Sequence, residues 1–431
     1  MKNELDLQSL SQKPNFPSRW TILIDELIPA FVKNRFSPKE AWKDKPFSQD
    51  DVAFFSKGLV ELSDFFTEDR EKAKLPNYFT TSKFRSSYLL YFFALQGAKF
   101  LTLFDRYPKA VAAAIAHAEE TGTLRIVDVG SGPGTASIAF LIYVLEIIAG
   151  GPQVKSSRKI NLPFKIQLVW IDQNEAILKD GQAMLASLFT FFPEFEGAID
   201  LTVEARAWWL HPKNFVFESS IVLFGNVLNE SSDDPRVYLK GLAPFLKNIK
   251  GGGVLMLEPA FKSASQRLSQ IRDELMPHRL WGPCLHEGKC PLANGRDWCH
   301  FSVPAELPGN FFKKFSIKLG SKREWLKFSF VWVAENVEKD KKLILSEQTA
   351  PKAVRIVSDP MRTPSGNQNQ FCRPVSIGWV KTPAIRPYYR GDVILAPGAR
   401  LDSRQTTGYT RKKEGPKNDS IPQPRFKPRR K

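Results

Sequence analysis

The stretch "VDVGSGPGTASIAF", residues 127–140, decides the fold expected for this chain. It begins as an apolar strand that holds Asp128, turns at Gly130, Gly132 and Gly134, and ends in a helical pattern. Glycines let the backbone turn sharply and approach a ligand without interference from a Cβ atom. The first turn of the following helix offers free N–H donors. The stretch therefore predicts a ligand-binding turn between a strand and a helix.

The apolar periodicity on either side of this turn predicts a parallel sheet. Short apolar runs alternate with helical patterns: the runs cover residues 124–130, 166–172, 219–227 and 253–259, and the helical patterns cover 174–189 and 233–249. Strands that alternate with helices are typical of a doubly wound α/β fold. Before residue 120 the chain has helical periodicity, with a capping-box start at Ser48 and Asp51, and residues 325–335 read as one more strand.

A second acid, Asp172, ends the next strand in "VWIDQNEA". A carboxylate at that place can accept both hydroxyls of a ribose, which suits an adenosine-bearing cofactor. The spacing D-x-G-x-G-x-G resembles motif I of the S-adenosylmethionine-dependent methyltransferases and differs from the dinucleotide fingerprint. The resemblance implies a Rossmann-like α/β core. It also implies a set of cofactor-binding residues: Asp128, Gly130, Ser131, Gly132, Gly134, Asp172 and Asn226.

The acceptor chemistry is less well specified. By the same resemblance, Phe224, Gly225 and Asn226 would line the pocket where the methyl group emerges. The sequence "NVLNES" that starts at Asn226 is not the Asn-Pro-Pro-aromatic signature of base-amine methyltransferases. The residues therefore nominate a cofactor site but no catalytic residue. An ordinary α/β turn that binds nothing is the alternative.

Charge and composition point to an anionic partner. Lys and Arg number 62 against 45 Asp and Glu, which gives a net charge of +17 and a sequence pI near 9.6. Nucleic acid is the simplest such partner, although a membrane surface would attract the same charge. No apolar run reaches the ~18 residues of a spanning helix, and no secretory or transit signal is visible. We expect a cytosolic, reduced protein without a membrane partner, in which clustered cysteines bind metal.

Three of the four cysteines lie in "CLHEGKCPLANGRDWCHF", residues 284–301. Cys284 and Cys290 enclose five residues, Cys290 and Cys299 enclose eight, and Cys299 and Cys372 enclose 72. These intervals do not fit a C-x-x-C zinc ribbon. A site with four sulfur ligands could hold zinc or a four-iron cluster. His286 and His300 could complete a zinc site without Cys372, and buried free cysteines are the remaining alternative.

The longer stretch "GPCLHEGKCPLANGRDWCHFSVP", residues 282–304, resembles a methyltransferase-like family associated with the small subunit of mitochondrial and bacterial ribosomes. Further matches are "LPNYFTTSKFRSSYLLYFF", the glycine loop, and "GGGVLMLEPAF", so the resemblance covers roughly residues 75–375. It implies that Cys284, Cys290, Cys299 and Cys372 ligate a [4Fe–4S] cluster that staples the C-terminal segment to the core. The Asn/Gln-rich setting of Cys372 departs from the strand expected there.

The C-terminal region mixes cations with aromatic residues. Cations can neutralise phosphates while aromatic faces stack on unpaired bases, a combination that favours RNA. The predicted RNA-binding residues are Arg386, Tyr388, Tyr389, Arg390, Arg411, Lys412 and Lys413. Residues 411–431 carry nine Lys and Arg against Glu414 and Asp419. We expect this segment to be a disordered basic tail, with a partnerless solubilising tail as the alternative.

Together these features predict four parts: a helical region at 1–120, a methyltransferase-like core at 121–335 with a cysteine loop inserted at 282–303, an extension at 336–410, and the tail. The expected function is that of a methyltransferase-like protein acting on or with small-subunit ribosomal RNA. A non-catalytic assembly or translation factor is the first alternative. A zinc-stabilised RNA-binding protein is the second.

Overall fold

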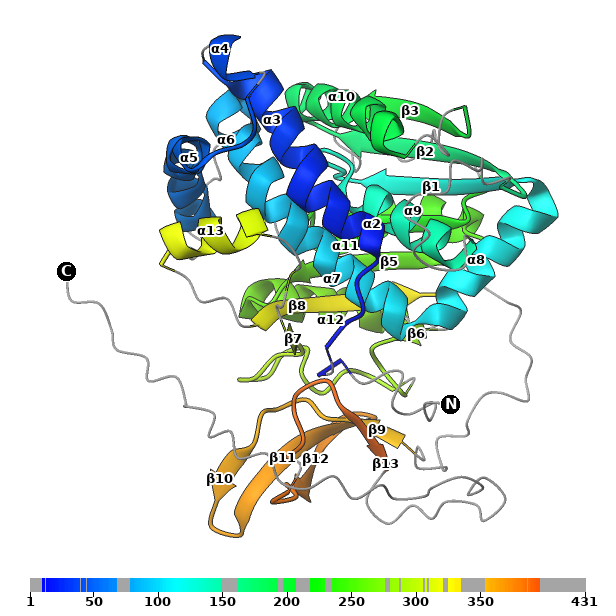
Figure 1. Cartoon of the computed structure of the whole chain (residues 1–431). Coiled ribbons are helices and arrows are strands. Elements are labelled where there is room, and N and C mark those ends of the chain that lie inside the picture. Colours follow the sequence, from blue (N-terminus) through cyan, green and yellow to red (C-terminus); the bar gives the residue numbers. More distant parts are fainter. Residues whose placement is uncertain are drawn as a thin grey trace, which may run out of the picture.

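The computed structural model (Figure 1) describes most of the chain between residues 10 and 395. The described ranges are 10–11, 13–38, 40–43, 45–67, 78–148, 162–192, 197–206, 218–228, 235–275, 280–286, 288–304, 307, 310–320, 325–334, 353–385 and 387–395. Arg386, Arg411, Lys412 and Lys413 lie outside them, and so does the predicted tail at 411–431.

A mostly parallel sheet forms the centre of the molecule, with strand order β3-β2-β1-β4-β5-β8-β6 and β7 paired to β8. Its strands are β1 (Thr123–Val129), β2 (Lys165–Asp172), β3 (Ile199–Ala205), β4 (Ile221–Gly225), β5 (Val254–Pro259), β6 (Leu280–Gly282), β7 (Phe301–Pro304) and β8 (Trp325–Val333). Strands β1 to β5 pair in parallel, whereas β8 is antiparallel to β5, β6 and β7. This order, with an antiparallel strand inserted near one edge, is that of the Rossmann-like methyltransferase fold and confirms the predicted fold class.

Alternation along the strands explains why both faces of the sheet are covered. Ile126, Leu168 and Leu223 point into one apolar core, and their neighbours Val127 and Val169 point into the other. The helices that cover the sheet are α8 (Pro108–Thr121), α9 (Thr135–Ile148), α10 (Glu175–Phe191), α11 (Pro235–Asn248) and α12 (Lys262–Glu274). The second core holds residues from α11 and α12, whereas the first holds residues from α8, α9 and α10.

The N-terminal region is helical, as predicted, and packs as a further layer beside the sheet (Figure 1). Its helices are α2 (Ser18–Ile22), η1 (Leu23–Leu27), α3 (Ile28–Phe36), α4 (Glu40–Lys43), α5 (Gln49–Thr67), η2 (Tyr78–Thr80), α6 (Ser82–Ser87), η3 (Tyr88–Phe92) and α7 (Phe93–Arg106). The capping box forms: the backbone N–H of Ser48 donates to Asp51 Oδ2 at 2.7 Å, and the Asp51 N–H donates to Ser48 Oγ at 3.3 Å.

One continuous helical run, Ser82–Arg106, is long and apolar enough to cross a membrane by length and composition. Its most apolar stretch of 18 residues is 89% buried inside the fold, where Phe93, Phe100 and Phe104 are among the largest fully buried side chains. The run is therefore placed as a core helix. The sequence shows no uninterrupted apolar run of that length, because Lys83, Arg85 and Lys99 interrupt this one.

The extension after β8 contains strands that the sequence analysis does not predict. It contains β9 (Ala353–Arg355), β10 (Met361–Thr363), β11 (Gly366–Arg373), β12 (Ser376–Lys381) and β13 (Val393–Leu395). Strands β10, β11 and β12 form an antiparallel sheet, and β13 pairs with β9. This C-terminal module lies below the main sheet in Figure 1, next to the connection between β6 and β7. A helix that the sequence did not predict, α13 (Asn310–Lys318), precedes β8.

Candidate functional site

The glycine loop joins β1 to α9 and is held against the end of β2 by backbone hydrogen bonds. The N–H groups of Gly130 and Ser131 both donate to the Ile171 carbonyl, at 2.7 and 3.1 Å. The Gly132 N–H donates to Asp172 Oδ2 at 2.9 Å. The strand order reverses between β1 and β4, so the loop stands at the switch point, where open α/β sheets bind their ligands.

The three glycines of the loop have different spatial constraints, although all have positive φ. A Cβ atom on Gly130 would lie 2.2 Å from Val227, and one on Gly134 would lie 2.1 Å from Trp170. A Cβ atom on Gly132 would meet nothing within 4 Å. Gly130 and Gly134 are thus required by close packing. Gly132 borders open space, which is where a ligand could approach the backbone.

The two acids of the motif occupy distinct places. Asp128 is 1% exposed, and its Oδ2 accepts the Ser137 N–H at 2.9 Å, so it braces the first turn of α9. Burial raises the pKa of Asp128 to about 7. Asp172 stands at the end of β2, where its two carboxylate oxygens accept the N–H groups of Gly132 and Asn174. Burial raises the pKa of Asp172 as well.

The end of β4 approaches the same loop. Asn226 has a φ of 60°, and its N–H donates to the Leu257 carbonyl at 2.8 Å. The next residue, Val227, is the one that packs on Gly130. The Leu228 N–H donates to the buried carboxylate of Glu258 at 2.8 Å. The structure therefore brings the predicted cofactor residues of β1, β2 and β4 to one edge of the sheet.

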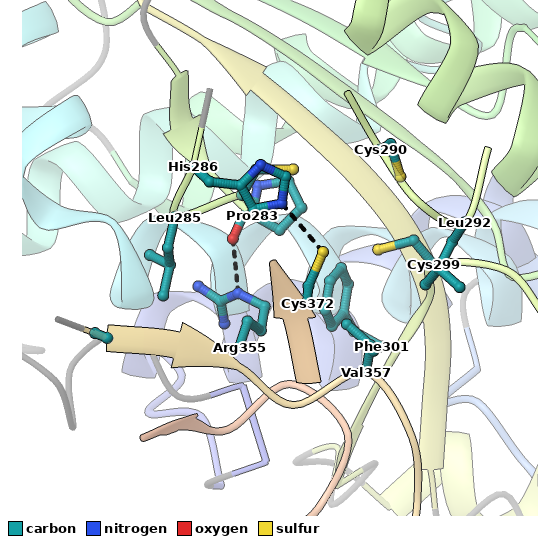
Figure 2. Close-up of a pocket in the computed structure, with 12 residues that line it drawn as sticks. Pro283, Leu285, His286, Cys290, Leu292, Cys299, Phe301, Arg355, Val357 and Cys372 are labelled. Carbon is teal, nitrogen blue, oxygen red and sulfur yellow. Dashed lines mark hydrogen bonds between the residues drawn. The ribbon is translucent and has the colours of Figure 1, made fainter. Parts of the chain in front are cut away.

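The four cysteines line a single pocket together with His286. Cys284 follows β6, Cys290 and Cys299 belong to the connection that leads to β7, and Cys372 lies on β11. In Figure 2 the sulfur atoms of Cys290, Cys299 and Cys372 point into the same space. The structure thus brings the distant fourth cysteine to the other three, as a shared site requires.

Burial shifts the pKa of four side chains that line the pocket. Burial raises the pKa of Cys290 and Cys299, with the neighbouring cysteines as the next cause. Cys372 behaves in the same way, and its Sγ lies 3.1 Å from His286 Nε2. Burial and the charge of Arg272 lower the pKa of His286 to about 4. The thiols of these three cysteines and the imidazole of His286 are therefore neutral near neutral pH without an added cation.

Hydrogen bonds fix the backbone that carries the cysteines. The Cys290 N–H donates to both oxygens of Asp273, at 2.9 and 3.1 Å. Ser329 Oγ donates to the Cys299 carbonyl at 2.8 Å. The Val375 N–H in the turn after β11 donates to the Lys289 carbonyl at 3.2 Å, which docks the C-terminal module on the cysteine loop. Sequence reasoning missed Asp273, because one acid near the end of a helix carries no distinctive signal.

Sequence reasoning also missed the pocket's arginines. Arg355 lines the pocket, and Arg272 donates to two carbonyls of the cysteine loop. Both side chains are almost fully buried, and a buried arginine cannot be distinguished from a surface arginine in the sequence alone. His300, the other histidine of the zinc alternative, does not line this pocket; its Nδ1 lies 3.1 Å from the Trp298 carbonyl oxygen.

The side chains of the described residues are not arranged as a metal centre. Across the described parts of the chain, no group of three or more His, Cys, Asp or Glu is arranged to hold a metal ion. The pocket therefore shows a shared location for the four cysteines but no coordination geometry.

The predicted RNA-binding residues of the C-terminal module differ in their exposure to solvent. Tyr389 is exposed and Tyr388 is half-buried. The prediction that Arg390 binds RNA needs correction. Its side chain is 7% exposed, its Nη1 donates to the Trp298 carbonyl, and its Nη2 lies 3.5 Å from Asp297 Oδ2. A guanidinium buried in this way is not available to phosphates. Trp379, which is 48% exposed on β12, is a better placed aromatic residue.

Comparison with known proteins gives one family match. Residues 200–373, less than half of the 431-residue chain, match the family described as mitochondrial small ribosomal subunit Rsm22. All four cysteines lie inside the matched segment. No curated protein matches the chain.

Several solved methyltransferase structures are similar at low identity. An rRNA methylase from Streptococcus thermophilus is 10% identical, with 51% of this chain and 94% of that chain covered and a TM-score of 0.24. An O-methyltransferase family protein from Burkholderia thailandensis is 12% identical, with 67% and 74% covered and a TM-score of 0.30. An S-adenosylmethionine-dependent methyltransferase from Clostridium acetobutylicum is 10% identical, with 56% and 99% covered and a TM-score of 0.25. The fold assignment rests on the strand order given above.

Proposed function

We propose that this protein binds S-adenosylmethionine at the glycine loop and acts on or with the RNA of the small ribosomal subunit. The match of residues 200–373 to a small-subunit family carries the ribosomal part of the proposal, since that segment spans the sheet from β3 onward and the whole cysteine pocket. The family description names the mitochondrial small subunit. The cytosolic location expected from the sequence stays a prediction, which subcellular fractionation would test.

The cofactor part of the proposal is supported by the fit of the loop. Gly132 leaves open space at the switch point, and α9 begins directly behind it with the N-terminal end of its dipole. Asp172 keeps lone pairs for ribose hydroxyls, because each carboxylate oxygen can accept more than one hydrogen bond. S-adenosylmethionine would supply an electrophilic methyl group there. The loop, Asp172 and Asn226 would hold and orient it.

The pocket part of the proposal is a [4Fe–4S] cluster ligated by Cys284, Cys290, Cys299 and Cys372. The donor set fits, because thiolates are the soft ligands that such clusters require. The pocket also suits a cluster that is completed after the core has folded. Its fourth cysteine comes from the C-terminal module, which docks on the cysteine loop through the Val375 N–H. Zinc bound by thiolates and His286 is the alternative content of the same pocket.

The RNA part of the proposal rests on the exposed face of β11 and β12. Trp379 pairs with Gln370 across the two strands, and Lys381 pairs with Gln368 on the same face. An exposed indole can stack on an unpaired base, the amides can bond its edge, and the lysine can bind a phosphate. Tyr389, 39% exposed, adds a second aromatic face in the same module.

A non-catalytic assembly or translation factor is the second candidate function. It is favoured by the apolar Val227, which packs on Gly130 beside the loop after β4, where a base-amine enzyme would present its acceptor signature. Under this reading the cofactor site contributes to shape and stability rather than to transfer.

Calorimetry with S-adenosylmethionine and a methyl-transfer assay on small-subunit RNA test the proposal on the full chain. We expect binding in the wild type and none in Gly132→Val, because the branched side chain enters the open space at the loop. Absence of binding to the wild type would contradict the cofactor assignment. If Gly132→Val loses the cofactor but supports normal subunit assembly in cells, the second candidate is correct.

A further inference from the structure

Three buried arginines from three separate segments contact the cysteine loop, and one of them, Arg355, also lines the pocket. Arg272 is on α12 and 1% exposed, Arg355 is on β9 and 3% exposed, and Arg390 precedes β13 and is 7% exposed. Arginine is rarely buried to this degree unless its guanidinium has specific partners. The position of those partners distinguishes this group from Arg19 and Arg106, the other buried arginines among the described residues.

Arg355 and Arg390 each donate to the backbone carbonyl that directly precedes a cysteine. Arg355 Nε donates to the Pro283 carbonyl, directly before Cys284, at 2.7 Å. Arg390 Nη1 donates to the Trp298 carbonyl, directly before Cys299, at 3.3 Å.

Arg272 holds the middle of the cysteine loop in the same way. Its Nη2 donates to the His286 carbonyl at 2.7 Å, and its Nη1 donates to the Gly288 carbonyl at 2.6 Å, between Cys284 and Cys290. The same guanidinium pairs with Asp273, which accepts the Cys290 N–H. One arginine and one carboxylate thus fix both ends of this part of the loop.

Arg355 also connects the module to the core. Arg355 Nη1 donates to the Gly391 carbonyl at 2.8 Å within the C-terminal module, and its Nη2 donates to the Tyr107 hydroxyl at 3.2 Å before α8. Its guanidinium also lies 5.8 Å from the centre of the Phe301 ring. Arg355 therefore contacts the cysteine loop, the core and the module at once.

The arginines retain donors for a further acceptor. Within the described residues, neither Arg272 Nε nor Arg390 Nε has a hydrogen-bond partner, although both atoms are buried. A buried donor without an acceptor costs about 1–3 kcal/mol, so such donors normally have a function. A sulfur-rich, negatively charged group inside the pocket would lower the cost of burying three cations close to it.

We propose that Arg272, Arg355 and Arg390 form an arginine collar that positions the cysteines and offsets the negative charge of an iron–sulfur cluster bound there. The inference rests on the cluster proposed above. The three arginines would act on it through the backbone of the cysteine loop that they hold. Positioning requires several donors on one planar group, whereas charge compensation requires only the cation. Lysine and methionine substitutions separate these two roles, because lysine keeps the charge and methionine keeps only the apolar stem.

The experiment uses full-length protein purified without oxygen, as wild type and as Arg355→Lys, Arg355→Met, Arg390→Lys and Arg390→Met. Arg19→Met is the matched control, because Arg19 is also 7% exposed but pairs with Glu146 away from the pocket. Iron and sulfide per folded chain, the midpoint potential of the cluster and the unfolding temperature are measured for each. We expect both substitutions at Arg355 and at Arg390 to lower iron content.

The midpoint potential distinguishes the collar from a purely structural role. Loss of a nearby cation disfavours the added electron, so both methionine variants should shift to more negative potentials than their lysine partners. Arg19→Met should lower the unfolding temperature and leave the potential unchanged. Unchanged potentials in the methionine variants, with a normal cluster in the wild type, would overturn the collar alone. Wild-type protein without iron would overturn the cluster and the collar's role towards it together.

Discussion

The glycine loop is one continuous run of residues, whereas the cysteine pocket is assembled from segments that start at Arg272 and end at Arg390. The loop is fixed by its own strand, its own helix and the end of β2. The pocket needs the C-terminal module to dock before its fourth cysteine is present. The comparison teaches that a site held by adjacent elements tolerates substitutions elsewhere in the chain. A site assembled from distant segments is disturbed by a substitution in any one of them.

The largest effect is expected at the assembled site. Cys372→Ser should abolish stable cluster binding, from about four iron atoms per chain to almost none, because a hydroxyl is a poor ligand for iron in such clusters. S-adenosylmethionine affinity should stay unchanged, since β11 does not touch the glycine loop. Iron analysis and calorimetry on anaerobic protein measure the two.

Two histidine variants complete that prediction. His286→Ala tests the imidazole that lies 3.1 Å from Cys372 Sγ, and His300→Ala is its control outside the pocket. Full iron content in Cys372→Ser together with iron loss in His286→Ala would show that the histidine is the fourth ligand.

The next effect distinguishes two glycines of the local site. Gly134→Ala places a Cβ atom 2.1 Å from Trp170 at a φ of 80°, which should cost about 2–4 kcal/mol of stability. Gly132→Ala has open space and should cost about 1–2 kcal/mol from backbone strain alone, yet it should weaken cofactor binding strongly. Chemical denaturation and calorimetry test the pair. Equal losses of stability would contradict the packing difference between the two positions.

A smaller effect concerns pH. Burial raises the pKa of Asp128 to about 7, above the ~3.9 of an unfolded aspartate, so the folded protein binds this proton more tightly. The stability from Asp128 is therefore present at low pH and is lost as pH rises from about 4 to about 7. Asp128→Asn keeps an acceptor for the Ser137 N–H without the charge.

The asparagine variant should therefore gain about 2–3 kcal/mol relative to the wild type between about pH 5 and about pH 8. Denaturation curves of both proteins at several pH values give the difference, in which the other carboxylates cancel. A constant difference across this range would mean that Asp128 does not titrate with the raised pKa.

The smallest expected change at either site comes from the tail. Removal of residues 411–431 should leave iron content and cofactor affinity as they are, while the plot of log RNA affinity against log salt flattens by about 3 units. Binding measured over a salt series with small-subunit RNA fragments gives the slope. An unchanged slope would assign the contact to the exposed face of β11 and β12.

The central sheet could be predicted from the sequence because its strands are short apolar runs that are buried on both faces, and the glycine loop could be predicted because its geometry is local. The C-terminal module could not, because β11 is rich in polar residues. Asn369 is fully buried there, and its amide donates to the carbonyls of Ser358 and Tyr388. Such a side chain reads as a loop residue until its distant partners are known.

Of the residues that line the pocket, only the four cysteines and His286 could be named from the sequence. The common location of Cys284 and Cys372 followed from a family resemblance rather than from spacing, since 72 residues separate Cys372 from the nearest other cysteine. Arg390 was assigned to RNA because basic residues near aromatic ones favour that partner. Its burial against Trp298 depends on docking of the module, which no local pattern contains.

The order of the pocket's residues along the chain has a consequence for synthesis. A ribosome makes Cys284, Cys290 and Cys299 first and reaches Arg390 about 90 residues later, a delay on the order of 5–20 s. During that interval three thiols exist without their fourth partner and without the module that encloses them. The pocket can therefore be completed only after the residues up to Arg390 have been made. A chain that is interrupted before residue 372 keeps three thiols without their fourth partner, and these thiols are open to oxidation.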